Sequence, residues 1–239
     1  MFDRELRRAM SPVLERAGCL LAGAGARPGM LTGTGFVAGA GACLAAAERA
    51  WPAALGLWLA NRLLDGLDGP VARARGGSEL GGFFDIVSDF AVYGGFVVGV
   101  AIGVPSARLA CVVLLFTYYM SGTAFLALSS LLEKRRAGTE ASDERSLRFV
   151  GGLAEGAETI VVYVLFCLLP GSAAMIAWSF AAAVGVTALQ RVYLGVRLLG
   201  RGSQRGSAAP SECLPRNQEI SLAVVQARPS FPSARPPKM

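Results

Sequence analysis

The chain has 239 residues, of which 53% are hydrophobic and 30 are glycine, and its formal net charge is +6 at pH 7. This composition is too apolar and too rich in small residues for an ordinary soluble domain. Histidine is absent from the sequence, which excludes Ser-His and Cys-His nucleophile systems and histidine metal sites. Five scattered cysteines without a C-x-x-C pair indicate packing residues. We therefore expect an all-α integral membrane protein in which acid–base chemistry falls to carboxylates.

The N-terminal segment, about residues 3–24, mixes charged and apolar side chains. Leu6, Met10, Val13 and Leu14 share one helical stripe, as in a helix that lies at a membrane surface. The segment lacks the small-residue cleavage site of a removable signal peptide. We expect an N-terminal interfacial amphipathic helix, and the alternative is a disordered basic arm.

Six apolar segments follow this helix. They cover residues 31–47, 51–73, 80–104, 107–132, 149–169 and 172–199. A membrane-spanning helix needs about 20 residues, so each segment is long enough to cross, the first with help from residues before Leu31. The sequence thus predicts a six-transmembrane-helix bundle within a membrane domain of residues 1–200. Its many glycines and alanines would let the helices approach closely.

Positive charge is distributed unevenly between the two sides of these segments. Arginines and lysines precede the first, separate the second from the third and the fourth from the fifth, and follow the sixth, whereas the opposite loops offer only Arg49 and Arg108. Because loops rich in Lys and Arg stay in the cytoplasm, both termini should be cytoplasmic. Residues 201–239 are rich in Arg, Ser and Pro, which predicts a disordered basic cytoplasmic tail, either solvated or touching lipid headgroups.

Four aspartates interrupt the second and third apolar segments at the ends that face the loop 74–79. They are Asp65, Asp68, Asp85 and Asp89. The spacing within each pair places both carboxylates on one face of a helix, and the two faces can converge. A carboxylate in hydrocarbon is costly unless it is compensated, so four of them require cations. The pattern predicts a divalent-metal site near the cytoplasmic membrane surface.

Ion pairing without a metal is the alternative for these aspartates. Arg73 and Arg75 are the local arginines, and four carboxylates need more positive charge than these two supply. We therefore favour the metal site.

Residues 65–89 read DGLDGPVARARGGSELGGFFDIVSD and specify more than the four aspartates. The stretch resembles the signature of the class I CDP-alcohol phosphotransferases, D-x-x-D-G-x-x-A-R, then seven or eight residues, then G-x-x-x-D-x-x-x-D. All the specified positions are filled, with the shorter gap between Arg73 and Gly81. The resemblance implies a homodimeric membrane enzyme of phospholipid biosynthesis, a phosphatidyltransferase. It would move a phosphatidyl group from CDP-diacylglycerol to a hydroxylated acceptor and release CMP.

The same resemblance gives the aspartates their roles. Asp65, Asp68, Asp85 and Asp89 would hold two divalent cations, Mg2+ or Mn2+, which suit a site made of oxygen ligands. Asp89 would also act as the general base that takes the proton from the acceptor hydroxyl, whose oxygen then attacks the phosphorus next to the lipid alcohol. From the residues alone, a fourth structural ligand is the alternative for Asp89.

Small and polar residues of the motif are candidates for binding the CDP moiety. The resemblance nominates Gly69, Ala72, Arg73, Ser78 and Gly81, and also Thr32, which ends a segment similar to a P-N-x-x-T-like stretch of the family. The small residues leave little side-chain bulk beside the carboxylates, so a flat nucleotide could approach the backbone there. Helix packing alone is the alternative for these glycines and alanines.

Three polar residues of the later segments are candidates for binding the acceptor. Glu155 and Glu158 lie at the start of the fifth segment, and Arg191 lies near the cytoplasmic end of the sixth. Intramembrane carboxylates are by default functional candidates, so the glutamates could bind hydroxyls or an amine, and Arg191 an acceptor phosphate. Ion pairs of the glutamates with Arg145 or Arg148, and snorkelling of Arg191 to the headgroups, are the alternatives.

Other activities would leave different patterns. One branch of the family transfers a head group from a soluble CDP-alcohol to a lipid, which the motif does not distinguish. A prenyltransferase would need two separated aspartate-rich motifs and more spans, and a small transporter with an acidic cation site would place its carboxylates near the midplane. The expected partners are a CDP-alcohol, a small hydroxylated acceptor, membrane lipids and a second copy of the chain, with no nucleic acid. The expected location is the bacterial inner membrane.

Overall fold

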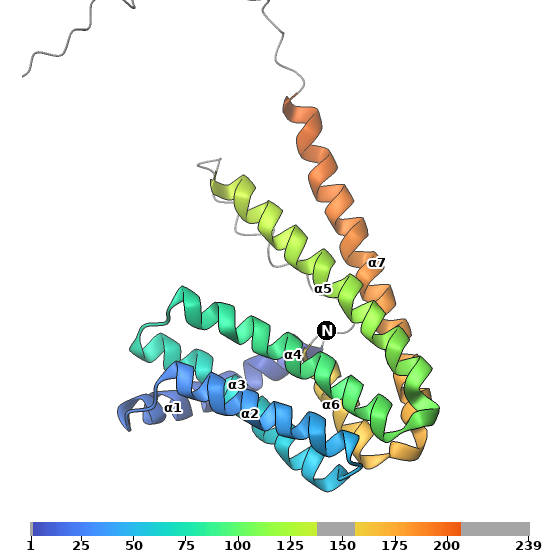
Figure 1. The fold of residues 1–239 in the computed structure, drawn as a ribbon. Helices are drawn as coiled ribbons and strands as arrows, with labels where there is room; N and C mark the ends of the chain where they lie inside the picture. Colours follow the sequence, from blue (N-terminus) through green and yellow to red (C-terminus); the bar gives the residue numbers. More distant parts are fainter. Residues whose placement is uncertain (1, 138–155, 207–239) are drawn as a thin grey trace, which may run out of the picture. The chain divides into compact units, whose positions relative to one another are not determined.

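The computed structural model describes residues 2–137 and 156–206, and over these residues the chain is helical without strands (Figure 1). The helices are α1 (Phe2–Gly23), α2 (Pro28–Ala47), α3 (Trp51–Arg75), α4 (Glu79–Gly103), α5 (Arg108–Ala137), α6 (Gly156–Leu168) and α7 (Ala173–Gly206). Short 3-10 helices, Pro105–Ala107 and Pro170–Ser172, precede α5 and α7. The chain divides into two units at Leu199 and Gly200, and the core, the acidic cluster and the cavities described below lie in the first.

Each predicted apolar segment contains a helix. Within the described part of the chain, four stretches are long and apolar enough to cross a membrane: Pro28–Ala47, Glu79–Gly103, Pro105–Lys134 and Pro170–Leu199. α3 has the length but carries charged residues through its second half, and α6 is apolar but short within the described residues. The all-helical expectation is therefore confirmed over the described residues, where four helices satisfy both criteria, and the count of six membrane spans stays a prediction.

The N-terminal helix and the C-terminal tail were also predicted from the sequence. The segment expected to be an N-terminal helix forms α1, while its position at a membrane surface stays a prediction. α7 continues to Gly206, past the boundary expected at residue 200. The rest of the predicted tail, and the part of the fifth segment before residue 156, lie outside the described residues.

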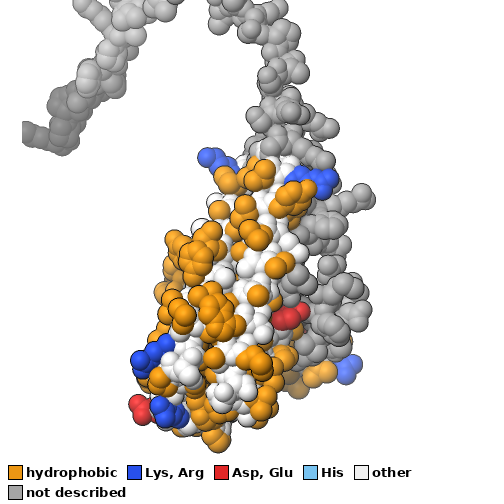
Figure 2. Space-filling view, turned by 90° about the vertical axis from the view of Figure 1, so that its right-hand side faces the viewer, with side chains coloured by type: hydrophobic (Ala, Val, Ile, Leu, Met, Phe, Trp, Pro, Cys, Tyr) orange, Lys and Arg blue, Asp and Glu red, His pale blue; other side chains and the backbone are white. Residues whose placement is uncertain are grey.

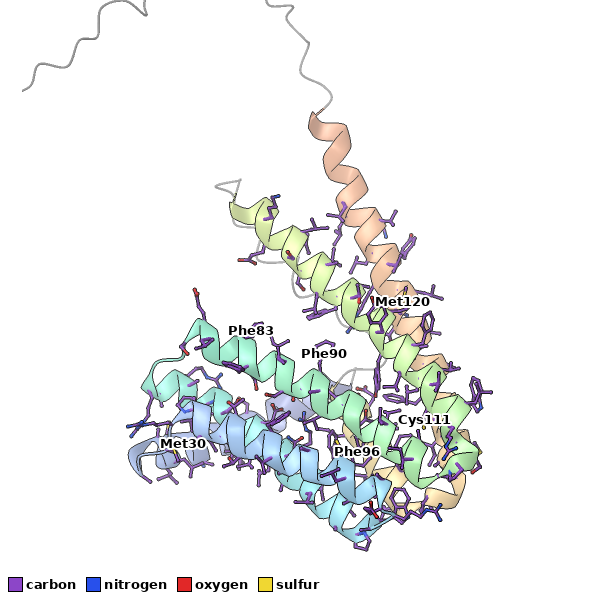
Figure 3. The ribbon with its side chains drawn as sticks, in the orientation of Figure 1. Met30, Phe83, Phe90, Phe96, Cys111 and Met120 are labelled. Carbon is purple, nitrogen blue, oxygen red and sulfur yellow. The ribbon has the colours of Figure 1, made fainter. Side chains whose placement is uncertain are left out.

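Aromatic side chains fill the core between α3, α4 and α6. The ring of Tyr163 lies 4.7 Å from the ring of Trp58 and 4.7 Å from that of Phe96, which is labelled in Figure 3. All three side chains are fully buried. On the outside, large apolar side chains such as Leu20 and Tyr119 stay 75% and 70% exposed. Hydrophobic side chains cover much of the face in Figure 2, as expected for a surface that lipid covers.

Glycines let α2 pack closely against α3 and α4. A Cβ atom on Gly39 would lie 2.5 Å from Cγ2 of Val92 and 3.0 Å from Nδ2 of Asn61. A Cβ atom on Gly99 would overlap the carbonyl oxygen of Cys43. Side chains at these positions would push the helices apart, so the small residues predicted to allow close packing do so here.

A short turn reverses the chain between α3 and α4. Gly76 has a φ of +85°, a conformation that favours glycine, and it ends α3. Ser78 then caps α4 by accepting a hydrogen bond from the backbone N–H of Gly81 at 3.0 Å. Because the turn is tight, the aspartates near the end of α3 lie beside those near the start of α4.

Candidate active site

Three of the predicted aspartates form a cluster. Asp65 and Asp68 come from α3 and Asp85 from α4, and one carboxylate oxygen of each lies within 4.8 Å of the others. Oxygens that bind one Mg2+ or Ca2+ ion at about 2.0–2.6 Å are at most about 5 Å apart, so these three can share an ion. All three side chains are half-buried. The donor set, oxygen throughout, fits a hard divalent cation.

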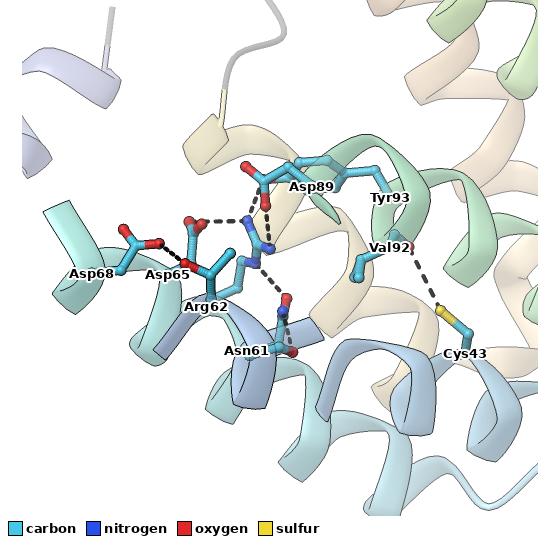
Figure 4. Close-up of polar contacts among 10 residues, drawn as sticks. Cys43, Asn61, Arg62, Asp65, Asp68, Asp89, Val92 and Tyr93 are labelled. Carbon is cyan, nitrogen blue, oxygen red and sulfur yellow. Dashed lines mark hydrogen bonds and ion pairs between the residues drawn. The ribbon is translucent and has the colours of Figure 1, made fainter. Parts of the chain in front are cut away.

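Asp89 faces the same small cavity as the cluster but has a different partner. The cavity has a volume of about 10 Å³, and its lining includes Thr32 of α2 and all four aspartates. A volume of this order holds one water molecule or ion. Oδ1 of Asp89 accepts a hydrogen bond from Nη2 of Arg62 at 2.8 Å (Figure 4). The structure thus brings all four predicted aspartates to one cavity, with Asp89 held by an arginine.

Arg62 lies inside this network, and the sequence analysis missed it. Its Nη1 donates to Oδ2 of Asp65 at 3.3 Å and to the Tyr93 hydroxyl at 2.6 Å. Its Nε donates to Oδ1 of Asn61 at 2.8 Å, and its side chain is only 7% exposed. The signal was an arginine three residues before Asp65 in an apolar segment, a spacing that puts both side chains on one helical face.

The two arginines considered in the sequence analysis have other partners. Arg73 forms an ion pair with Glu15 of α1. Nε and Nη2 of Arg75 donate to the carbonyl oxygen of Ala22 at 3.0 and 2.7 Å. Both therefore fasten α1 to the end of α3, and the charge compensation within the cluster comes from Arg62.

Comparison with known proteins identifies the family to which the chain with this acidic cluster belongs. The CDP-alcohol phosphatidyltransferase family matches residues 26–190, which include all four aspartates and Arg62. The chain belongs to this family. The resemblance found in the aspartate motif is thereby confirmed, and the chain is a membrane-bound transferase of phospholipid metabolism.

Individual proteins are similar to this chain in sequence or in fold. The inner membrane protein YnjF of Escherichia coli (strain K12) is 39% identical over 196 residues, which cover 82% of this chain and 95% of that protein. Two crystal structures of the Mycobacterium tuberculosis phosphatidylinositol phosphate synthase PgsA1 share the fold at 19% identity. The one with CDP-DAG bound matches with a TM-score of 0.62, over 77% of this chain and 94% of that one. The one in complex with manganese and citrate matches with a TM-score of 0.61, over 76% and 88%.

The nucleotide-binding candidates of this CDP-alcohol phosphatidyltransferase lie on α2, on α3 and at the start of α4. Gly69, Ala72 and Arg73 are on the last turns of α3, and Ser78 and Gly81 begin α4. A Cβ atom on Gly69 would lie 3.5 Å from Nη1 of Arg73, an ordinary van der Waals contact.

Thr32 comes from α2, and its hydroxyl donates to Oδ2 of Asp68 at 3.2 Å. The threonine nominated from the P-N-x-x-T-like stretch is therefore in direct contact with the cluster. Nucleotide binding by Thr32 and by the candidates on α3 and α4 stays a prediction.

A second, larger cavity of the transferase opens beside Asp89, between α4, α5, α6 and α7. Its volume is about 550 Å³, and Asp89, Thr159 and Arg191 are among the residues that line it. Arg191 donates to Oγ of Ser121 at 2.7 Å and lies 5.1 Å from the ring centre of Phe125. The predicted acceptor residue Arg191 thus shares a cavity with the predicted base.

The glutamates nominated for the acceptor are only partly located. Glu158 lies in the first turn of α6, next to Thr159 of the large cavity. Glu155 lies outside the described residues. Neither glutamate is assigned to the cavity by the geometry.

Proposed function

We propose that this enzyme transfers a phosphatidyl group from CDP-diacylglycerol to a hydroxyl acceptor and releases CMP. The observation that carries the proposal is the position of Asp89, which lines both the small acidic cavity and the 550 Å³ cavity. A base there reaches a donor held at the acidic cluster and an acceptor held in the larger cavity. The structure of PgsA1 with CDP-DAG bound, which has the same fold, supports the choice of donor.

The acidic cluster fits a divalent metal. Asp65, Asp68 and Asp85 would hold it, and the family resemblance implies two ions, Mg2+ or Mn2+, with Asp89 as a further ligand. Bound ions would neutralise the charge of the diphosphate and of the departing CMP. The complex of PgsA1 with manganese and citrate supports a metal of this class.

Individual residues of the chain would have separate roles in this reaction. Asp89 accepts the proton of the acceptor hydroxyl, and the hydroxyl oxygen forms a bond to the phosphorus that carries the lipid alcohol. The bond from that phosphorus to the oxygen of CMP breaks, and CMP leaves with the electron pair. Arg191 would bind an anionic group of the acceptor from the wall of the large cavity, and Glu155 and Glu158 are candidates for its hydroxyl or amine groups.

The CDP moiety would lie on the side of the cluster where α3 turns into α4. Gly69 and Ala72 present little bulk there, and Arg73 supplies a positive charge near the phosphates. Ser78 and Gly81 form the first turn of α4, whose backbone N–H groups favour an anion, and Thr32 touches the cluster from α2.

In the membrane, we propose that α2 to α7 all span the bilayer and that α1 lies at its surface. The excess of arginine and lysine on one side supports a cytoplasmic position for the termini, the tail of residues 201–239 and the active site. The name of the E. coli relative supports the inner membrane as the location. A homodimer is proposed from the family resemblance.

A second direction of transfer is supported by the lining of the large cavity. Ile86, Phe90, Leu115, Phe125 and Leu126 contribute apolar surface to it. Such a lining also suits a lipid acceptor that receives a head group from a soluble CDP-alcohol. The two directions differ in which substrate carries the acyl chains.

The test is CMP release by the purified protein in detergent. Labelled CDP-diacylglycerol or a soluble CDP-alcohol is supplied with Mn2+ or Mg2+ and a panel of water-soluble and lipid acceptors. We expect acceptor-dependent release with CDP-diacylglycerol, and release only from the soluble donor would establish the second direction. Absence of release from either donor would refute the proposed function.

The role of Asp89 is tested by Asp89→Asn, with Glu79→Gln on the same helix as the control. We expect the asparagine variant to lose about 100-fold or more in turnover, because a positioned base contributes about 10²–10⁴-fold. The control should keep the activity of the unmodified enzyme, since Glu79 lies outside both cavities. Near-normal turnover of Asp89→Asn would show that this carboxylate is not the base.

A further inference from the structure

The large cavity has an aromatic side chain in its wall, next to the proposed base. Phe90 directly follows Asp89 on α4, and both residues line this cavity. Phe90 is nevertheless 49% exposed, so part of its side chain faces the cavity and part lies on the outer surface of the protein. The segment that carries it, Glu79–Gly103, is apolar and long enough to span a membrane. We therefore expect lipid on the outer side of this ring.

A glycine on α5 allows the ring of Phe90 to lie against that helix. A Cβ atom on Gly122 would lie 2.7 Å from Cε1 of Phe90 and 3.2 Å from its Cζ, so the edge of the ring packs directly on the glycine. Figure 3 shows Phe90 on the side of α4 that faces α5. Gly122 also lines the large cavity. The contact between Phe90 and Gly122 thus joins α4 to α5 along one wall of the cavity.

The residues proposed to act on the acceptor lie beside this contact. On α4, Asp89 is the neighbour of Phe90. On α5, Gly122 and Phe125 are three residues apart, which places them on one helical face. Arg191, the proposed ligand of the acceptor's anionic group, lies 5.1 Å from the ring centre of Phe125. An acceptor that reaches both the base and this arginine would therefore lie along the inner side of the wall.

The size of the cavity limits which acceptors it can enclose. Its volume is about 550 Å³. Since a water molecule takes up about 30 Å³ in the liquid, the cavity has room for about 18 groups of that size. The two acyl chains of a membrane lipid contain more methylene groups than this, so a lipid acceptor would have to extend its chains through the wall into the bilayer. A small phosphorylated alcohol fits inside.

We propose that Phe90, packed on Gly122, closes the large cavity toward the bilayer and selects a small water-soluble acceptor over one that carries acyl chains. Phe90 is then a specificity-determining residue of the transfer reaction. This inference rests on the proposed function and deepens it, because it names the class of acceptor. Of the two directions of transfer, it favours the one in which the CDP-activated donor carries the acyl chains.

The proposal is tested by Phe90→Ala with CDP-diacylglycerol as the donor. CMP release is measured with the best water-soluble acceptor of the panel and with phosphatidylglycerol, a hydroxylated acceptor that carries acyl chains. The ratio of the two kcat/KM values, water-soluble over lipid, should fall by about tenfold or more, the scale on which the shape of an apolar pocket discriminates between substrates. An unchanged ratio, or an unmodified enzyme that prefers phosphatidylglycerol, would overturn the proposal.

Phe83→Ala is the matched control. Phe83 is an aromatic residue of the same helix, also labelled in Figure 3, and is 60% exposed, but it lines neither cavity. This control should keep the ratio of the unmodified enzyme. An equal fall of the ratio in Phe83→Ala would overturn the proposal, because the effect would then come from the loss of any apolar surface on α4.

Two further variants separate the wall from a general disturbance of the fold. Phe90→Leu keeps an apolar side chain and covers the case in which the alanine variant does not fold; its ratio should fall by a smaller factor. Gly122→Ala should also lower the ratio, because its Cβ atom would displace the ring of Phe90. In the Phe90→Ala background the same substitution should have no further effect, and an equal effect in both backgrounds would overturn the proposal.

Photolabelling tests the closure of the cavity without any turnover. The protein is placed in lipid bilayers that contain a phosphatidylglycerol with a diazirine on one acyl chain, and the labelled residues are located by mass spectrometry. Thr159 of α6 is buried and lines the cavity, so it should be labelled in Phe90→Ala and not in the unmodified protein. Equal labelling of Thr159 in both would overturn the proposal. If no donor gave CMP, the proposed function would fail, while the labelling would still show whether Phe90 closes the cavity.

Discussion

Replacing Gly99 with alanine tests whether the close approach of α2 to α4 supports the fold. A Cβ atom at Gly99 would overlap the carbonyl oxygen of Cys43 and lie 3.2 Å from Cβ of Ala46. Backbone atoms cannot rotate away, so α2 and α4 would have to separate. Gly94 on the same helix is the matched control, because a Cβ there would lie 4.0 Å from Cδ2 of Leu115, an ordinary contact.

The two substitutions have the same effect on helix propensity but differ in steric overlap. Alanine in place of glycine favours the helix by about 1 kcal/mol at both positions, so this contribution cancels when the variants are compared. What remains is the steric effect at Gly99, and overpacking of this kind destabilises proteins by about 1–3 kcal/mol. We therefore expect Gly99→Ala to be less stable than Gly94→Ala by about 1–3 kcal/mol.

Unfolding of both variants by sodium dodecyl sulfate in mixed micelles, followed by tryptophan fluorescence, measures this difference in the free energy of unfolding. Trp58 reports on the core because it is fully buried between α3, α4 and α6. Equal stability of the two alanine variants would refute the reasoning, since it would mean that α2 and α4 can separate at no cost.

Three further outcomes test the site and its surroundings. Asp85→Asn should weaken Mn2+ binding by at least about tenfold, because even changes to partners outside the first ligand shell cost about 10–100-fold in metal affinity. Glu79→Gln, the control, should leave the Mn2+ affinity unchanged. Equal Mn2+ affinities of the two variants would exclude Asp85 as a ligand. Exhaustive chelation should abolish CMP release and added Mn2+ should restore it, and activity that survives chelation would remove the metal from the mechanism. Glu15→Gln should change the free energy of unfolding by less than about 1 kcal/mol, because its ion pair with Arg73 is exposed. A larger loss of stability would show that this ion pair holds α1 more strongly than surface pairs do.

Much of the site was predictable because its information is local. The spacing of Asp65 and Asp68, and of Asp85 and Asp89, placed each pair on one helical face, and the short loop between the helices brought the faces together. Thr32 was nominated for nucleotide binding, and the structure shows that its hydroxyl contacts Asp68, while nucleotide binding stays a prediction. Patterns of this kind can be read from the sequence because the spacing of residues along a helix determines which side chains share a face.

Other features depended on how the helices pack. Arg62 was overlooked because its importance lies in partners on another helix, Asp89 and Tyr93, that no spacing along the chain reveals. Arg73 was counted among the cations local to the aspartates, but it pairs with Glu15 of α1. Which charge meets which partner is a property of the assembled helices.

The sequence by itself determined the class of the protein, the family and the four carboxylates, because apolar length, residue type and helical spacing are written along the chain. Only the tertiary structure decided that Asp89 borders two cavities and is held by Arg62, because both facts depend on distances between helices. Those distances follow from the small residues at which α2 meets α3 and α4, where steric contact leaves little freedom for the helices to move.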